Sequence, residues 1–124
     1  MVQSAKQISN TKLQTMIPQG VAFHNAGLSY QDRNIVERLF LEMKIKVLCT
    51  TSTLSMGINL PARLVVVKST QCYRGSGKGY QEYTRIEVEQ MMGRAGRPPF
   101  DTEGTVVIMT QKSNYSKYNE KLEL

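Results

Sequence analysis

Two guanidinium groups recur at helical spacing in residues 84–99, TRIEVEQMMGRAGRPP. Thr84 followed by Glu87 is a capping-box pattern, which predicts that a helix begins at this point. One face of that helix would carry a polar set with i, i+3, i+4, i+7 spacing, namely Gln90, Gly93, Arg94 and Arg97. A planar guanidinium can grip two oxygens of an anion at once. The spacing therefore favours anion binding on this face.

The glycines at 93 and 96 oppose a purely structural role for this helix. Each weakens a helix by about 1 kcal/mol relative to alanine, a cost that a structural helix does not normally carry. The alternative interpretation is a solvated basic face near a helix C-terminus, where arginine suits the helix dipole. Spacing alone leaves both interpretations open.

Composition restricts the class of protein. The chain has 124 residues, 40% hydrophobic and 21% charged, which is typical of one modest globular domain. No apolar stretch is long enough to cross a bilayer and no signal peptide is recognisable, so we expect no membrane association. The net charge of +6 favours an anionic partner, with nucleic acid the first candidate.

The two cysteines and the single histidine argue against a metal site. Cys49 lies inside the apolar run of residues 45–49, which predicts a buried, reduced thiol and favours the cytosol or nucleus. His24 follows a short predicted strand and is expected to make a hydrogen-bonding contact rather than act as a general base. No carboxylate pair or nucleophile–base set is recognisable.

Hydrophobic periodicity predicts alternating helices and strands. Helices are expected at residues 10–17, from residue 29, from residue 84 and at 115–122, and strands at 21–24, 44–51, 64–67 and 105–110. Residues 71–83 are polar and glycine-rich and are expected to form a surface loop, while residues 112–124 form a helical tail. Strands that alternate with helices pair in parallel through right-handed crossovers. The expected fold class is therefore α/β, an open and mostly parallel sheet flanked by helices.

Three hydrogen-bonding groups follow predicted strands, and ligands of open α/β sheets gather beyond the carboxyl ends of strands. They are residues 24–27 (HNAG), the hydroxyls of residues 50–53 and residues 68–70 (KST). Such groups suit a phosphate backbone better than an apolar metabolite. Residues 75–79, GSGKG, are instead interpreted as a surface turn, because a phosphate-binding loop needs Ser or Thr after its lysine.

Three segments resemble the second RecA-like domain of superfamily-two helicases. They are GVAFHNAGL at 20–28, TTSTLSMGINLPA at 50–62 and QMMGRAGRPPFD at 90–101, which resemble motifs IVa, V and VI. The ends of the last two resemble the Ski-two-like DExH helicases, and the run STLSMGINLPARLVVVKST most resembles the meiotic crossover helicases of the Mer-three or Hfm-one type. The resemblance covers residues 18–111 and implies a RecA-like sheet truncated at its N-terminal side, so that residues 1–124 form part of that domain.

The resemblance implies roles for the residues of motifs V and VI. Arg97 would be the arginine finger, supplied to ATP on the first RecA-like domain of the same protein. Arg94 and Gln90 would hold the γ-phosphate network, with Gly93 beside them. Gly57 and Asn59 would approach the ribose. Fixed positive charge around a transferring phosphoryl group fits this chemistry.

The resemblance also implies a nucleic-acid track. Its expected residues are His24, Asn25, Gly27, Thr51, Ser52 and Lys68. Asn25 stands where the group more often has a second histidine, so the detail of that loop departs from the family's pattern.

The implied function is part of the motor core of an ATP-dependent DNA helicase that acts on single-stranded DNA or unwound duplex in meiotic recombination, with a nuclear location. ATP with Mg²⁺ would be bound by a phosphate loop and metal ligands on the first motor domain. Because these elements are absent from the sequence, the isolated fragment is expected to be inactive. Two alternatives stay open: an RNA helicase of the same group, in splicing or RNA decay, and a non-catalytic nucleic-acid-binding or adaptor module.

Overall fold

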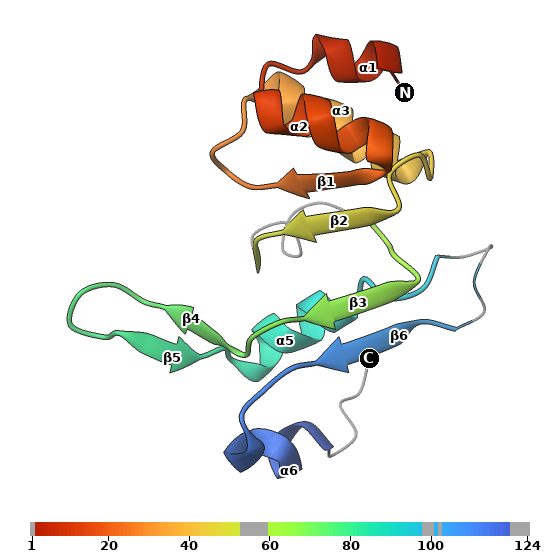
Figure 1. Ribbon diagram of the computed structural model, residues 1–124. Coiled ribbons are helices and arrows are strands. Elements are labelled where there is room, and N and C mark those ends of the chain that lie inside the picture. The colour runs from red at the N-terminus through yellow and green to blue at the C-terminus, as the bar shows by residue number, and fades with distance from the viewer. Residues whose placement is uncertain (1, 53–59, 98–100, 102, 120–124) are drawn as a thin grey trace. The chain divides into compact units, whose positions relative to one another are not determined.

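The computed structural model describes residues 2–52, 60–97, 101 and 103–119. The chain divides into two compact units, Met1–Leu60 and Pro61–Leu124, which are described here separately. Figure 1 shows the elements of both.

The first unit places helices on one face of a parallel strand pair. Its elements are α1 (Val2–Gln7), α2 (Thr11–Met16), the 3-10 turn η1 (Ile17–Gln19), β1 (Val21–His24), α3 (Tyr30–Leu41) and β2 (Val47–Thr50). Strands β1 and β2 pair in parallel, with Val21 opposite Val47 and His24 opposite Thr50. The helix between them is the crossover that parallel pairing requires.

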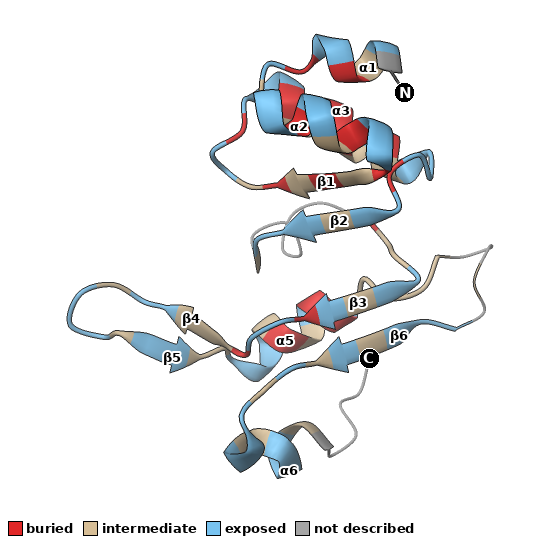
Figure 2. Cartoon of the chain, viewed as in Figure 1, coloured by how far each residue is buried: buried red, intermediate tan, exposed pale blue. Residues whose placement is uncertain are grey.

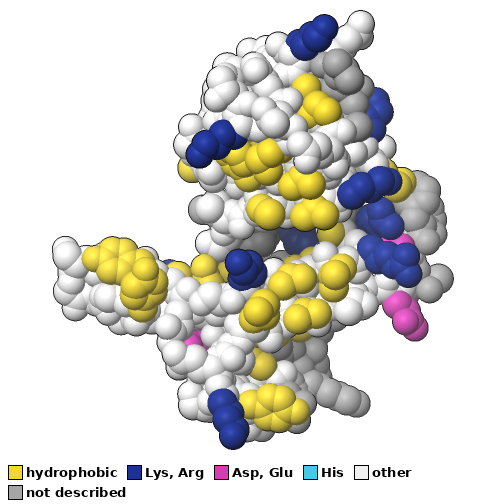
Figure 3. Space-filling model, viewed as in Figure 1, with side chains coloured by type: hydrophobic (Ala, Val, Ile, Leu, Met, Phe, Trp, Pro, Cys, Tyr) yellow, Lys and Arg dark blue, Asp and Glu magenta, His cyan; other side chains and the backbone are white. Residues whose placement is uncertain are grey.

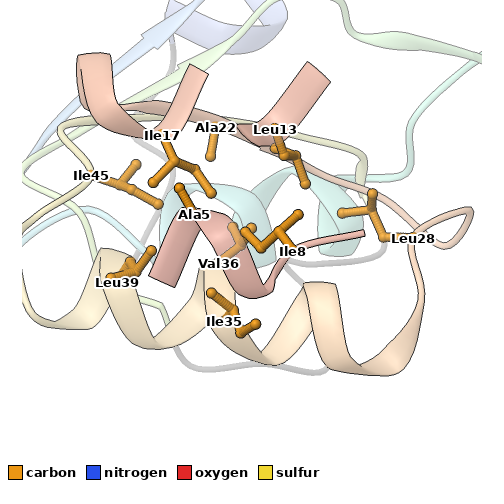
Figure 4. Packing of buried hydrophobic residues seen from close by; sticks show 10 residues of the cluster. All are labelled: Ala5, Ile8, Leu13, Ile17, Ala22, Leu28, Ile35, Val36, Leu39 and Ile45. Atoms are coloured by element: carbon orange, nitrogen blue, oxygen red, sulfur yellow. The ribbon is translucent and has the colours of Figure 1, made fainter. Parts of the chain in front are cut away.

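The core of this unit consists of apolar side chains from the three helices, from β1 and from the segments between these elements. Figure 4 shows them: Ala5, Ile8, Leu13, Ile17, Ala22, Leu28, Ile35, Val36, Leu39 and Ile45. Ala22 and Leu48 are paired across the two strands and therefore share the face that packs on this core. Helix α1 is absent from the sequence expectations, because a six-residue helix with one apolar edge gives almost no periodic signal.

Asn10 and Ser29 stand where the sequence predicts that helices begin, and both side chains cap their helices. The Asn10 side chain accepts from the Leu13 amide at 3.1 Å, and the Ser29 hydroxyl accepts from the Asp32 amide at 3.1 Å. The Asp32 carboxylate, however, also bonds outside its own helix. It accepts from the Ser9 amide and hydroxyl and from the Asn10 amide, at 2.8–3.0 Å. The buried Asp32 thus ties the first turn of α3 to the start of α2.

The second unit contains another parallel pair, an antiparallel hairpin and two helices. Its elements are β3 (Leu64–Val67), β4 (Gln71–Tyr73), β5 (Tyr80–Glu82), α5 (Arg85–Met92), β6 (Thr105–Ile108), η2 (Lys112–Asn114) and α6 (Tyr115–Asn119). Strands β3 and β6 pair in parallel, with Leu64 opposite Thr105 and Val67 opposite Ile108. Helix α5 packs on β3.

These elements confirm the predicted α/β class with parallel strands and crossover helices. Residues 71–83 differ from a plain loop, because β4 and β5 pair from Gln71–Glu82 to Tyr73–Tyr80. Residues 75–79 form the turn of this hairpin. They lie between two strands rather than between a strand and a helix, so they are a surface turn.

The apolar runs at residues 44–51 and 64–67 predict strands that are covered on both faces. Within each unit this prediction is wrong. Cys49 is exposed rather than buried, and Val47 is 53% exposed. In the second unit Leu64, Val66 and Val107 are about half exposed. Figure 2 colours parts of β3 and β6 as exposed, and Figure 3 shows hydrophobic side chains at the surface. Each parallel pair carries helices on one face only, so alternate side chains of each strand stay uncovered by the described residues of their own unit.

Candidate functional site

The arginines of the candidate site lie beyond the end of α5. The Thr84 hydroxyl caps this helix by accepting from the Glu87 amide at 3.2 Å, and the helix ends at Met92 with Gly93 as its C-cap. The expected helical face that joins Gln90 to Arg97 is therefore wrong. Gly93 ends the helix, and Gly96 has φ +96°, a left-handed conformation that an α-helix cannot contain.

The segment after α5 is instead fixed by backbone bonds to residue 62. The Ala62 amide donates to the Arg94 carbonyl at 2.8 Å, and the Gly96 amide donates to the Ala62 carbonyl at 2.6 Å. These bonds form an isolated parallel bridge between Ala62 and Ala95. They join the end of the predicted motif V to the middle of motif VI. The backbone that carries Arg94 and Arg97 is therefore fixed by two hydrogen bonds to Ala62.

A close approach supports this bridge from the other side. A Cβ on Gly104 would lie 2.6 Å from the Gly96 nitrogen and 2.7 Å from the Ala95 carbonyl oxygen. Real Cβ atoms are not found so close to backbone, and only glycine has none. Gly104 immediately precedes β6. Its backbone packs against residues 95 and 96 and so helps to fix the segment that carries Arg94 and Arg97, which we call the Arg97 mounting.

Arg97 forms an ion pair with Asp101. Its Nε donates to Oδ2 at 2.8 Å, its Nη2 donates to Oδ1 at 3.4 Å, and its backbone amide donates to Oδ2 at 3.1 Å. The Asp101 side chain is 11% exposed and that of Arg97 is 30% exposed. The hydrogen bond from Arg97 lowers the pKa of the Asp101 carboxyl, and that from Asp101 raises the pKa of Arg97. Both groups are charged at neutral pH.

The other predicted nucleotide contacts are placed only in part. Gln90 is exposed in the last turn of α5, Gly93 is exposed just after it, and Arg94 is half-buried. Gly57 and Asn59 lie outside the described residues.

In the first unit, His24 lies inside rather than on the surface. It is 5% exposed, and its Nε2 lies 2.8 Å from a carboxylate oxygen of Glu37 on α3. The loop after it presents Asn25 and Gly27 instead. The Asn25 side chain accepts from the Gly27 amide at 2.9 Å, and Leu28 anchors the far end in the core. The His24–Glu37 pair therefore holds a loop whose exposed part is residues 26–27 with Asn25 half-buried.

The predicted hydroxyl group follows β2 at the same edge as this loop. The Thr51 amide donates to the His24 carbonyl at 3.3 Å, so the ends of β1 and β2 are directly joined. Thr51 is exposed and Ser52 is half-buried. The structure thus brings together the predicted nucleic-acid residues 24–27 and 51–52, as the carboxyl ends of parallel strands should.

Lys68 occupies the corresponding position in the second unit. It is exposed at the carboxyl end of β3, beside a shallow hollow of about 520 Å³. The hollow is lined by Lys68, Ser69, Thr70, Gln71, Ile108, Met109, Thr110 and Gln111. Among these lining residues, the Thr70 and Thr110 hydroxyl oxygens lie 2.6 Å apart. A cation among hydroxyl and amide groups is the composition that a phosphate backbone needs.

Residues 1–99 match the family described as the helicase conserved C-terminal domain. The chain belongs to this family. Since the match covers most of the chain and both parallel strand pairs agree with it, the RecA-like reading of the fold stands.

Three of the similar proteins are helicases by name. The chain is 49% identical over 97% of its length to the ATP-dependent DNA helicase MER3 homolog of Oryza sativa and 48% identical over 89% to the ATP-dependent DNA helicase MER3 of Saccharomyces cerevisiae. It is 43% identical over 92% to the U5 small nuclear ribonucleoprotein 200 kDa helicase of Drosophila melanogaster. The chain covers 10%, 9% and 5% of these proteins, respectively.

Two residues of this helicase C-terminal domain were not expected from the sequence. Asp101 ends the motif VI segment but had no assigned role, and Glu37 lies on a helix whose periodicity explains only its apolar face. A sequence signal exists for Asp101, because it stands four residues after Arg97. None exists for Glu37, because its partner lies 13 residues away on a strand.

Two kinds of feature are absent from the residues that the structure describes. Over the described ranges, no helix is long and apolar enough to span a membrane. The same residues contain no group of three or more His, Cys, Asp or Glu side chains that could hold a metal ion.

Proposed function

We propose that this chain is part of the motor core of an ATP-dependent DNA helicase, which couples ATP hydrolysis to movement along single-stranded DNA and to duplex unwinding. Arg97 acts as the arginine finger toward ATP held by the first RecA-like domain of the intact protein. The observation that carries the proposal is the mounting of Arg97, on backbone bonded to Ala62 and with its guanidinium bonded to Asp101.

A rigid mounting matters because phosphoryl transfer is catalysed mainly by positioning and by fixed charge. Negative charge spreads over the transferring group, and a guanidinium already in place stabilises it without reorganising. Arg94 and Gln90 complete the γ-phosphate contacts, with Gly93, Gly57 and Asn59 beside the nucleotide. Arginine suits this role better than lysine because its planar fork reaches two oxygens at once.

Mg²⁺ belongs elsewhere in the intact protein under this proposal. It prefers carboxylate oxygens and phosphates, whereas the Asp101 carboxylate beside Arg97 is already paired with that guanidinium. The phosphate loop and metal ligands are therefore assigned to the first motor domain. When bound there, the metal would neutralise phosphate charge.

The nucleic-acid track is assigned to the strand ends of each unit. Asn25 and Gly27 after β1, Thr51 and Ser52 after β2, and Lys68 after β3 offer amide, hydroxyl and ammonium groups to phosphates. His24 supports the track by holding its loop through Glu37, because the buried imidazole has no exposed edge to offer. A track of this kind grips backbone and is insensitive to base sequence.

Turnover by the intact protein tests the proposal. Arg97→Ala should reduce kcat for ATP by about 10³- to 10⁵-fold, the range known for arginine fingers, and should leave single-strand affinity nearly unchanged. Arg97→Lys should rescue little, because a point charge does not reproduce the two-oxygen grip. Arg38→Ala is the matched control, since Arg38 is an exposed arginine of α3. Loss of DNA binding with normal turnover would place Arg97 on the nucleic-acid surface instead.

A second candidate is an RNA helicase of the same group. The similarity to the U5 small nuclear ribonucleoprotein 200 kDa helicase favours it. Stimulation of turnover by single-stranded DNA and by RNA of the same sequence separates the two functions. The DNA assignment requires stronger stimulation by DNA.

A third candidate is a non-catalytic adaptor, which leaves the Arg97 mounting without a purpose. It predicts that the intact protein shows no nucleic-acid-stimulated ATP hydrolysis.

The proposal extends to meiotic recombination and the nucleus, and rests there on the resemblance of residues 52–70 to the meiotic crossover helicases. Fluorescence imaging of the tagged intact protein tests this extension. It requires nuclear signal on meiotic chromosomes, and a cytoplasmic protein absent from meiotic cells would contradict it.

A further inference from the structure

Asp101 holds one edge of the Arg97 guanidinium. A guanidinium has five N–H donors in a fixed planar fork. The Asp101 carboxylate accepts from Nε and from one hydrogen of Nη2, which together form the side edge of that fork. In the part of the chain that the structure describes, Nη1 has no hydrogen-bond partner. The Nη1/Nη2 edge therefore keeps donors for a second anion.

Backbone hydrogen bonds also link Arg97 and Asp101. The Arg97 amide donates to the same Oδ2 that accepts from Nε, and the Asp101 amide donates to the Arg97 carbonyl at 2.8 Å. The carboxylate is thus fixed relative to the backbone from which the Arg97 side chain rises. With the Asp101 side chain only 11% exposed, water competes weakly for these bonds.

We propose that Asp101 is a positioning residue for the arginine finger, holding Arg97 by its Nε edge so that its Nη1/Nη2 edge is presented to the transferring phosphoryl group of ATP. The inference rests on the proposed role of Arg97 and adds a residue to it. Without Asp101, a long flexible side chain must be ordered during each turnover, and the ordering cost falls on the reaction barrier.

The geometry distinguishes positioning from competition. If Asp101 were a latch that ATP must displace, carboxylate and phosphate would have to share one edge of the guanidinium. The carboxylate instead occupies the Nε side, and a bidentate phosphate contact fits the other edge. Removing Asp101 should therefore lower turnover, whereas removing a latch would raise it.

The test is a double-mutant cycle in the intact protein. Asp101→Ala should lower kcat for ATP by roughly 10- to 100-fold, the scale of a small misplacement of a catalytic group. KM for ATP and single-strand affinity should change little, because Asp101 contacts neither ligand. Asp101→Asn keeps the shape and one acceptor oxygen, so it should fall between Asp101→Ala and the unsubstituted protein. In an Arg97→Ala background, Asp101→Ala should cause no further loss.

The cycle separates the two proposals. If Arg97→Ala itself leaves turnover intact, the finger assignment fails and the role of Asp101 fails with it. If Arg97→Ala abolishes turnover while Asp101→Ala equals or exceeds the unsubstituted protein, the finger stands and positioning by Asp101 is overturned. An equal loss from Asp101→Ala in both backgrounds also overturns it, because Asp101 would then act independently of Arg97. Should Asp101→Ala fail to fold, as seen in its melting temperature, the isosteric Asp101→Asn carries the same cycle.

Discussion

The Gly96 amide donates to the Ala62 carbonyl at 2.6 Å. Ala62 ends the predicted motif V, and Gly96 lies between the two arginines of motif VI, more than thirty positions later in the sequence. With the bond from the Ala62 amide to the Arg94 carbonyl, this hydrogen bond makes the two motifs one structural element. A substitution that shifts the backbone of one motif should therefore also shift the backbone of the other.

Gly104→Ala should destabilise the second unit. The added methyl group would overlap the backbone of residues 95 and 96, which cannot move without breaking the bridge to Ala62. Overpacking of this kind costs typically 1–3 kcal/mol. Thermal unfolding of the chain measures the loss, with Thr105→Ala as a control at the exposed neighbouring position. Equal melting temperatures for the two variants would show that the backbones do not approach this closely.

Asp32 should make the stability of the chain depend on pH. Burial would raise the pKa of this carboxyl, but hydrogen bonds from Ser9, Asn10 and Ser29 outweigh it and lower the pKa. A folded pKa below the unfolded value of about 3.9 means that the stabilisation is present above that pH. It is lost as pH falls below about 4 and through the folded pKa.

Unfolding measured between pH 7 and pH 2 tests this dependence. Asp32→Ala should cost about 1–3 kcal/mol at pH 7, because it removes a buried charged acceptor that is hydrogen-bonded to Ser9 and Asn10. Asp32→Asn should remove part of the acid-induced loss of stability, whereas Glu103→Gln at an exposed position should not. An unchanged acid transition in Asp32→Asn would contradict the assignment.

The sequence predicts local structure well where the signal depends only on neighbouring residues, as in helix caps and apolar strands. Ser29, Asn10 and Thr84 cap their helices as expected, and β1, β3 and β6 lie where apolar runs predicted them. Helical spacing does not predict the structure after Met92. The spacing of polar residues continues through Gly93 and Gly96 in the sequence, although the helix ends there and the backbone turns. Nothing local indicates the Ala62 bridge, which depends on residues far apart in the chain.

Burial was harder to predict than secondary structure. An apolar strand such as β2 reads as covered on both faces, yet the helices of its own unit cover only one, and Cys49 is exposed. The same limit applies to His24, whose type suits a surface contact but whose position opposite α3 gives it Glu37 as a partner. Such pairings follow from packing between elements, which a single sequence does not encode locally.

The isolated chain should bind single-stranded nucleic acid weakly and without sequence preference. Its net charge of +6 and the polar strand ends predict a log–log salt slope of about −0.7 for each phosphate neutralised. Thr51→Ala should weaken binding, whereas Thr15→Ala on the exposed face of α2 should not. Fluorescence anisotropy across a salt series measures both effects. Affinity that is independent of salt would argue against a backbone track.

The same purified chain should hydrolyse no ATP above background, with or without single-stranded DNA. None of its motifs supplies a phosphate loop or magnesium ligands, so the finger has no nucleotide to act on. Phosphate release is the readout, and activity that follows the chain through further purification would contradict the division of labour proposed for the two motor domains.

The central claim is that Arg97 acts on the transferring phosphoryl group, and the most direct measurement compares two nucleotide complexes of the intact protein. The affinity for ADP with aluminium fluoride, which resembles the transferring group, is measured beside the affinity for ADP alone. Arg97→Ala should weaken the first by at least about 10²-fold and leave the second nearly unchanged, since a finger strengthens its grip in the transition state. Equal changes in both affinities, or no change in either, would contradict the account.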